Sequence, residues 1–312
     1  MARMAGLART AFEGFETVNL EVNGTVLWVR YRRHPDARAP AVLLLHGFPQ
    51  TGFIWHRMAA CLAANYSVVC PDLRGYGASA KPAGAPDHST YSKRTLAGDA
   101  VALMDALGFD AFHLVGHDRG ARVAHRLAVD HPERVASLCL LDISPTLAMY
   151  ESTSMEFAQS YFHWFFLIQP QPLPEMLISG HEKEMLHAFL GGWGGAGLKP
   201  YAPEALAEYE RAWSDPATIH ANCEDYRASA SIDLEHDRAD RAAGRQIGCP
   251  LLVVWGQRGV IARLFDPLAD WQARSRGPVV GQGLDAGHFL PEEAPEALLE
   301  MLVPHLERAQ AA

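Results

Sequence analysis

The residues best placed to do chemistry lie in a short turn between an apolar run and a helical pattern. Phe112 to Val115 is a continuous apolar run, and Gly116-His117-Asp118-Arg119-Gly120 follows it. Helical spacing of apolar residues begins at Ala121. A strand-to-helix turn this tight needs small residues two positions before and after its centre, and here both are glycines. Such a turn raises the central side chain, Asp118, above the sheet with a helix N-terminus beneath it.

An aspartate at the centre of this turn predicts substitution at an sp3 carbon. Serine attack on such a carbon would leave a stable ether, whereas carboxylate attack leaves an ester that an activated water can hydrolyse. We therefore expect Asp118 to be a nucleophile. The alternative is a degenerate turn in a non-catalytic binding protein.

Three further motifs extend the pattern along the chain: His46-Gly47-Phe48-Pro49 after an early apolar run, Pro71 to Gly77 after the next, and Asp285-Ala286-Gly287-His288-Phe289 after the last. Together with the Gly-x-Asp-x-Gly turn, these motifs resemble the α/β-hydrolase family over nearly the whole chain. The resemblance implies that His288 is the general base for the ester-hydrolysing water. It also implies that the backbone N–H groups of Phe48 and Arg119 form the oxyanion hole.

Two acids compete for the role of orienting His288. The family often places this acid after the strand that corresponds to Leu251 to Trp255, but Gly256 to Val260 contains no acid. Asp142 directly follows another apolar run, at a position where some members carry the acid. We expect Asp142 to be the third member. Asp266 is the second choice, and its alternative role is a helix N-cap before Pro267.

Two arginines stand at the start of the helix predicted after the turn. Arg119 and Arg122 are three residues apart and therefore lie on neighbouring faces. A helix N-terminus carries about +0.5 of an elementary charge, so two cations there need compensating anions. Asp118 can supply one, and a substrate carboxylate would supply another, because guanidinium forks bind carboxylates in a bidentate manner. The pair favours a small anionic substrate. For Arg122 alone, a surface position or a structural ion pair is the alternative.

At this point the resemblance narrows to the fluoroacetate (haloacetate) dehalogenases. The turn with its two arginines and the run His46 to Gln50 are similar to that family, as are two halide-pocket motifs, Tyr161-Phe162-His163-Trp164-Phe165-Phe166 and Glu224-Asp225-Tyr226-Arg227. The resemblance implies that His163, Trp164 and Tyr226 donate hydrogen bonds to the departing halide, and that Phe48 lines the pocket. The family's acid lies where Asp142 lies. Fluoride needs such donors because it leaves poorly unless its growing charge is solvated. Without the turn, ordinary core packing of His163 and Trp164 would be the expectation.

These residues together predict a hydrolase of 2-haloacids that needs no cofactor and no metal, and that converts fluoroacetate to glycolate and fluoride. An epoxide hydrolase is the main rival, because it uses the same aspartate and histidine with tyrosine proton donors. Tyr226 could be one donor and Tyr161 or Tyr150 the second. A neutral epoxide, however, offers nothing to two guanidinium groups. A hydrolase-like ligand receptor or scaffold is a rival from another class.

The elements that must position these residues form an α/β pattern. Short apolar runs alternate with helical patterns, which predicts a mostly parallel sheet flanked by helices, an α/β-hydrolase fold. The expected strands are Glu16 to Val22, Val26 to Tyr31, Ala41 to Leu45, Ser67 to Cys70, Phe112 to Val115, Leu138 to Leu141, Leu251 to Trp255 and Pro278 to Gly281. The expected helices are Ile54 to Ala64, Lys93 to Leu107, Ala121 to Asp130 and Pro291 to Leu306.

The alternation stops after Pro145 and resumes at about Gly248, and helical, aromatic-rich sequence fills the interval. We expect residues 1–145 and 249–312 to form the hydrolase core domain and residues 146–248 to form a helical cap domain.

Composition limits the partners and the compartment. The chain has 312 residues, of which 49% are hydrophobic, and a formal net charge of −9, which excludes intrinsic disorder and argues against a nucleic-acid partner. A literal GxGxxG match at Gly192 to Gly197 follows a helical pattern rather than a strand, so we expect no nucleotide cofactor there. We expect a cytoplasmic protein with no membrane partner, for three reasons. The five cysteines include no CxxC pair, the N-terminus lacks a secretory signal, and no apolar run is long enough to span a bilayer. The dehalogenase resemblance implies a homodimer.

Overall fold

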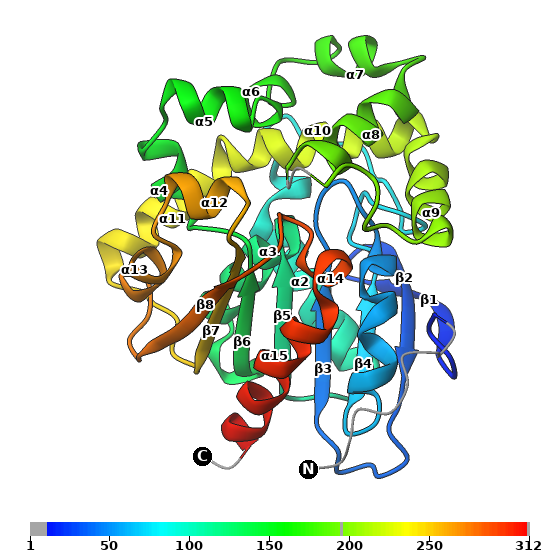
Figure 1. Ribbon diagram of the computed structural model, residues 1–312, viewed down its shortest axis with the longest axis vertical. Helices are drawn as coiled ribbons and strands as arrows, with labels where there is room; N and C mark the ends of the chain where they lie inside the picture. The colour runs from blue at the N-terminus through cyan, green and yellow to red at the C-terminus, as the bar shows by residue number, and fades with distance from the viewer. Residues whose placement is uncertain (1–10, 194–195, 311–312) are drawn as a thin grey trace.

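A computed structural model describes residues 11–193 and 196–310. Its centre is one eight-stranded sheet in the order β1-β2-β4-β3-β5-β6-β7-β8 (Figure 1). The strands are β1 Glu16–Val22, β2 Thr25–Arg32, β3 Ala41–Leu45, β4 Ser67–Pro71, β5 Phe112–His117, β6 Val135–Leu141, β7 Leu251–Gly256 and β8 Val279–Leu284. β2 pairs antiparallel with β1 and β4, and all other neighbours are parallel. β1 and β2 form a hairpin across Asn23-Gly24. The predicted mostly parallel sheet is confirmed.

Helices cover both faces of the sheet. They are α1 Ala59–Leu62, α2 Lys93–Ala106, α3 Arg119–Asp130, α12 Val260–Leu264, α13 Pro267–Gln272, α14 Leu290–Glu293 and α15 Pro295–Gln310, with the 3-10 turns η1 Gly52–Arg57, η2 Ser89–Tyr91 and η3 Pro132–Arg134. On β3, Leu43 and Leu45 join the apolar cluster that contains α2 and α3. Val42 and Leu44 join the cluster that contains α1 and α15. Burial on both faces explains why this strand is apolar throughout rather than alternating.

Between β6 and β7 the described chain adds helices and no strand to the sheet. These helices are α4 Thr146–Glu151, α5 Met155–Ser160, α6 His163–Phe166, α7 Leu173–Ile178, α8 Glu182–Gly192, α9 Pro203–Trp213, α10 Pro216–Ser229 and α11 Ile232–Ala243, and we call them the cap. Helices α5 to α10 lie over one end of the sheet (Figure 1). That end carries the carboxyl termini of the parallel strands, because Arg119, just after β5, contacts Asp225 of α10. The division into core and cap domains at residues 145 and 249 stays a prediction.

Two predicted helices differ from the structure. In place of one helix from Ile54 to Ala64, the chain forms η1 and the single turn α1, because Met58 N–H donates to the carbonyl of Trp55 three residues back and tightens the segment. The helix predicted from Pro291 to Leu306 is interrupted at Ala294. The residue before a proline avoids the helical region, and Ala294, which precedes Pro295, has φ −146° and ψ 51°.

The GxGxxG match follows helix α8 and not a strand, as its helical pattern indicated. Two of its glycines, Gly194 and Gly195, lie outside the described residues.

Candidate active site

Asp118 occupies the strained turn between β5 and α3. Its backbone has φ 46° and ψ −113°, a conformation that few non-glycine residues adopt. Close packing enforces it: a Cβ on Gly116 would lie 2.5 Å from the Cα of Ala121, and one on Gly120 would lie 2.2 Å from the carbonyl oxygen of His46. Only glycine fits at these two positions, as the sequence predicts. The side chain of Asp118 is buried at the end of the sheet beneath the cap.

One carboxylate oxygen of Asp118 is already held by a backbone donor. The N–H of Phe48, in the loop after β3, donates to Asp118 Oδ1 over 2.9 Å. A Cβ on the preceding residue, Gly47, would come within 2.5 Å of Asp118 Cβ, so only glycine lets this loop approach. Arg119 is the first residue of α3, and its N–H has no carbonyl partner within the helix. Oδ1 is therefore the oxygen that a backbone donor binds, and Oδ2 is the oxygen nearer to His288.

His288 and Asp142 meet at the same end of the sheet although 146 residues separate them in the chain. His288 Nδ1 donates to Asp142 Oδ2 over 2.6 Å, and the N–H of Gly256 donates to Asp142 Oδ1 over 2.8 Å. Asp266, the other candidate acid, caps α13 instead by accepting from the N–H of Ala269. The structure thus brings Asp142, not Asp266, to His288.

The second ring nitrogen of His288 faces Asp118. His288 Nε2 lies 4.0 Å from Asp118 Oδ2, which is too far for a direct hydrogen bond, and this nitrogen has no hydrogen-bond partner in the described chain. A base in this position can take a proton from a water that attacks an ester on Asp118. The backbone of His288 is also held, because His117 Nε2 donates to the carbonyl oxygen of His288 over 2.8 Å.

Neighbouring charges set the protonation states of both groups. Burial by itself would raise the pKa of Asp118, but His288, Arg119 and Arg122 together lower it below its ordinary value. Burial would lower the pKa of His288, but the hydrogen bond and charge of Asp142, with the charge of Asp118, raise it above 6.5. Asp118 is therefore ionised and suited to nucleophilic attack, and His288 is a stronger base than a free imidazole.

The cap places aromatic donors over Asp118. His163 and Trp164 come from α6 and Tyr226 from α10, and all three are buried. The ring of Phe48 stacks on His163 at 5.9 Å and meets Tyr226 edge-on at 5.1 Å. His163 Nδ1, Trp164 Nε1 and Tyr226 Oη are buried without a hydrogen-bond partner in the described chain. Buried donors of this kind cost free energy unless they serve a ligand, so their convergence indicates a site for an electron-rich atom.

The hydroxyls of Tyr150 and Tyr161 share this property. Both hydroxyls are buried, and neither has a hydrogen-bond partner among the described residues. Tyr150 packs against Trp164 at 5.0 Å, and Tyr161 lies 6.4 Å from the ring of His288.

Both arginines are buried, and each leaves one N–H-bearing atom unpaired in the described chain, Nη1 of Arg119 and Nε of Arg122. Arg119 has a compensating anion that the charge argument from the sequence did not include. Its guanidinium forms a two-pronged ion pair with Asp225 of the cap, Nε to Oδ2 over 3.1 Å and Nη2 to Oδ1 over 2.9 Å. The charges of both arginines act on Asp118 and lower its pKa.

A family model described as alpha/beta hydrolase fold matches residues 40–295. The chain belongs to the α/β-hydrolase family. It is 44% identical over 309 residues to a fluoroacetate dehalogenase of a Burkholderia species, an alignment that covers 96% of each chain. It is 31% identical to a soluble epoxide hydrolase of Corynebacterium sp. (strain C12), over 83% of this chain and 87% of that one. A crystal structure from Nostoc sp PCC 7120, assigned as an alpha/beta hydrolase, superposes with a TM-score of 0.91 at 50% identity, covering 95% of this chain and 99% of that one.

Sequence reasoning missed one participant of this α/β-hydrolase site. Asp225 stands next to Tyr226 in the sequence motif and has no predicted role of its own, yet it is fully buried and binds Arg119, Lys93 and the hydroxyl of Tyr76. Its place in that motif was the sole signal in the sequence, because its partners lie more than 100 positions away.

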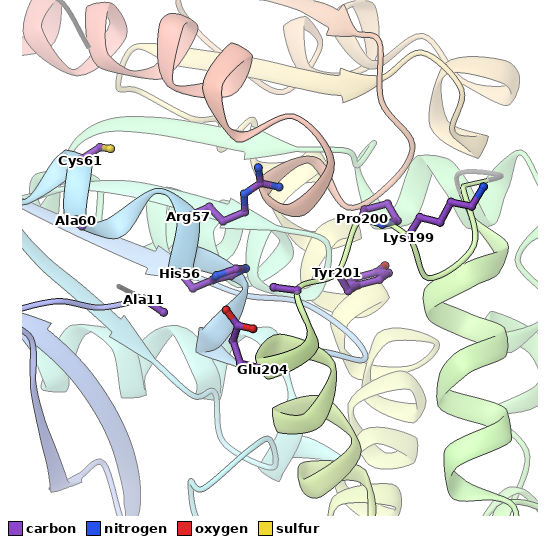
Figure 2. Close-up of a pocket in the computed structure, with 10 residues that line it drawn as sticks. Ala11, His56, Arg57, Ala60, Cys61, Lys199, Pro200, Tyr201 and Glu204 are labelled. Atoms are coloured by element: carbon purple, nitrogen blue, oxygen red, sulfur yellow. The ribbon is translucent and has the colours of Figure 1, made fainter. Parts of the chain in front are cut away.

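A separate cavity of about 370 Å³ lies at the junction of η1, α1 and the segment before α9. Figure 2 shows its lining, with His56, Arg57, Tyr201 and Glu204 among the labelled residues. None of the predicted site residues lines it. The described residues also contain no group of three or more His, Cys, Asp or Glu side chains that could hold a metal ion. Among the described helices, none has the length and apolar character required to cross a bilayer.

Proposed function

We propose that this α/β-hydrolase is a haloacetate dehalogenase that converts fluoroacetate and related small 2-haloacids to 2-hydroxyacids and halide. The observation that carries the proposal is the pair Arg119 and Arg122, buried directly after an ionised nucleophile and each with an unpaired donor. A neutral substrate would leave these donors unsatisfied, whereas a carboxylate satisfies both. The fluoroacetate dehalogenase relative supports the same substrate class.

The proposed reaction has two steps. Asp118 Oδ2 attacks the carbon that bears the halogen, the carbon–halogen bond breaks, and the halide departs toward His163, Trp164 and Tyr226. Each hydrogen bond to the developing anion is worth about 1.5–3 kcal/mol. His288, oriented by Asp142, then takes a proton from a water that attacks the ester carbon of Asp118. The negative charge develops on Oδ1, where the N–H groups of Phe48 and Arg119 stabilise it. The intermediate then collapses: the bond between the ester carbon and Oδ2 breaks, the 2-hydroxyacid leaves with Oδ2 and takes the proton from His288, and the water oxygen remains in the regenerated carboxylate of Asp118.

Halide release tests the proposal. Purified enzyme is incubated with fluoroacetate or chloroacetate, and fluoride or chloride is measured with an ion-selective electrode. No release from either substrate at near-stoichiometric enzyme would refute it. A His288→Asn variant is the complementary test, because it should retain a carboxymethyl ester on Asp118 that intact-protein mass spectrometry detects. A receptor or scaffold would give no adduct.

An epoxide hydrolase is the second candidate. The buried, unpaired hydroxyls of Tyr150, Tyr161 and Tyr226 favour it, since an opening epoxide needs a proton for its oxygen. Diol formation from a neutral epoxide without halide release from haloacetates would establish this function instead.

The proposed enzyme is a cytoplasmic homodimer. Its five cysteines are free thiols, which suits a reducing compartment. The cap exposes large apolar side chains that a second copy could cover, namely Met155, Phe162, Leu173, Met176 and Leu177. Light scattering coupled to gel filtration gives the mass, and a monomer at micromolar concentration would contradict the dimer.

A further inference from the structure

The two arginines beside Asp118 differ in how their charges are neutralised. Arg119 is fully buried and its charge is matched by the carboxylate of Asp225. Its Nη2 also donates to the carbonyl oxygen of Asp225 over 2.8 Å and to Ser229 Oγ over 2.5 Å. The guanidinium is therefore held at several points by one helix of the cap, and only Nη1 is left unpaired in the described chain.

Asp225 belongs to a group of buried charges that balances internally. Lys93 of α2 forms ion pairs with Asp225 and, over 3.5 Å, with Asp233 of α11. Arg119 and Lys93 thus carry two positive charges against the two carboxylates of Asp225 and Asp233. The Tyr76 hydroxyl donates to Asp225 Oδ2 over 2.6 Å and completes the shell. Arg119 and Lys93 together lower the pKa of Asp225 against the opposing effect of burial, so this carboxylate stays ionised.

Arg122 has a different environment. Its Nη1 donates to the carbonyl oxygen of Ser144 over 3.1 Å and to Thr146 Oγ1 over 2.8 Å, and its Nη2 lies 3.3 Å from Met149 Sδ. The ring of Trp164 lies 4.7 Å from the guanidinium carbon. All of these partners are uncharged. Across residues 11–193 and 196–310, no carboxylate lies within 4.0 Å of Arg122, and burial with the nearby charge of Arg119 lowers its pKa.

We propose that Arg122 alone supplies the charge that selects a carboxylate substrate, and that Asp225 is a positioning residue that makes Arg119 a fixed, charge-neutralised hydrogen-bond donor. This inference rests on the proposed function and deepens it. Of the two guanidinium groups, only that of Arg122 offers a bound carboxylate a positive charge that no ion pair already matches, although the charge of Asp118 also acts on it. Arg119 orients the substrate carboxylate by a hydrogen bond from Nη1 and adds no net charge, because Asp225 already balances the charge of its guanidinium group.

The division of labour predicts how the enzyme distinguishes an acid from its amide. Chloroacetate and chloroacetamide have nearly the same shape and the same leaving group, and they differ in charge. The ratio of their kcat/KM values therefore isolates charge recognition from positioning and from the chemistry at Asp118. Both rates are followed by chloride release.

The experiment uses two variants, one that lowers the net charge of the site and one that leaves it unchanged. Arg122→Gln removes the cation that lacks an ion-pair partner, and it should lower the acid-to-amide ratio by about 100-fold. The double variant Arg119→Gln/Asp225→Asn removes one cation together with its own anion, so the net charge of the site is unchanged. It should lower kcat/KM for both substrates and leave their ratio nearly unchanged.

The result that overturns the inference is a ratio that collapses in the double variant as far as in Arg122→Gln, or a ratio that Arg122→Gln leaves intact. If the double variant does not fold, as judged by circular dichroism, Arg119→Lys replaces it, since a lysine retains the charge opposite Asp225 and loses the fork. The same outcome is expected. Failure of the proposed function is separate and visible earlier: a wild-type enzyme that releases no chloride from either substrate refutes both statements.

Discussion

Replacing Asp142 by asparagine should stop the reaction at the ester on Asp118. Asp142 contacts His288 and does not contact the substrate carbon, so the displacement of halide does not depend on it. The amide of an Asp142→Asn variant has one oxygen, and the N–H of Gly256, which donates to Oδ1 over 2.8 Å, would bind it. The NH2 group then faces His288 Nδ1 and forces the ring proton onto Nε2. In that tautomer the base cannot accept a proton from water.

The size of the effect follows from the contact that is lost. At 2.6 Å and an effective dielectric constant of ~20, the attraction between a carboxylate and an imidazolium is about 6 kcal/mol. This is the stabilisation that the aspartate gives to His288 when the ring becomes charged during ester hydrolysis. Since each 1.36 kcal/mol is a factor of ten in rate, about 6 kcal/mol corresponds to about four factors of ten, and we expect kcat to fall by about 10⁴-fold.

A single-turnover experiment separates the two steps. Enzyme in excess over fluoroacetate should release fluoride in the variant at a rate close to that of the wild type, and mass spectrometry should find the ester on Asp118. The reasoning is refuted if fluoride release slows as much as steady-state turnover does, or if no ester accumulates. A loss of less than tenfold in kcat would also contradict it.

The remaining predictions concern pH, packing and the leaving group. The pKa of His288 is raised above 6.5, and the ring acts as a base only when it is neutral. The rate of ester hydrolysis should therefore increase with pH, with a midpoint above 6.5. A midpoint below 6.5 in single-turnover pH profiles would contradict this. By linkage, the raised pKa of His288 stabilises the fold at pH values below the pKa of this residue in the unfolded chain. This stabilisation is lost as the pH rises through its pKa in the folded chain. Melting temperatures of the wild type and of His288→Asn, measured across this pH range, test it. Gly47→Ala should lower kcat by about 100-fold, because the added Cβ would lie 2.5 Å from Asp118 Cβ and displace the nucleophile. Gly248→Ala is the matched control: its added Cβ would have no atom within 4 Å, so this variant should retain activity. Trp164→Phe should slow fluoride release by about 10- to 100-fold and chloride release less, because fluoride depends more on donated hydrogen bonds; an equal effect on both halides would show that Trp164 has a packing role only.

The boundaries of several elements illustrate how far local sequence reasoning extends. The strands and the helix after Asp118 were predictable because burial on two faces and 3.6-residue spacing leave a direct pattern in the sequence. The break at Ala294 carried a visible signal, the following Pro295, yet the continuous apolar spacing beyond it hid the interruption. The tightening of η1, where Met58 N–H donates to the carbonyl of Trp55, left no such signal in the sequence.

The sequence by itself determined the fold and the turn that raises Asp118, the proposed nucleophile, because both rest on neighbours in the chain. Gly116 and Gly120 stand two positions from Asp118, and the turn they permit is a local event of chain sterics. Only the tertiary structure decided which acid serves His288 and which anion serves Arg119. Asp142 is 146 residues from His288, and Asp225 is 106 residues from Arg119. Such pairs are selected by the strand order and by the packing of the cap on the core. A buried charge takes whichever partner the fold brings within reach, and that choice leaves no periodicity or spacing in the sequence.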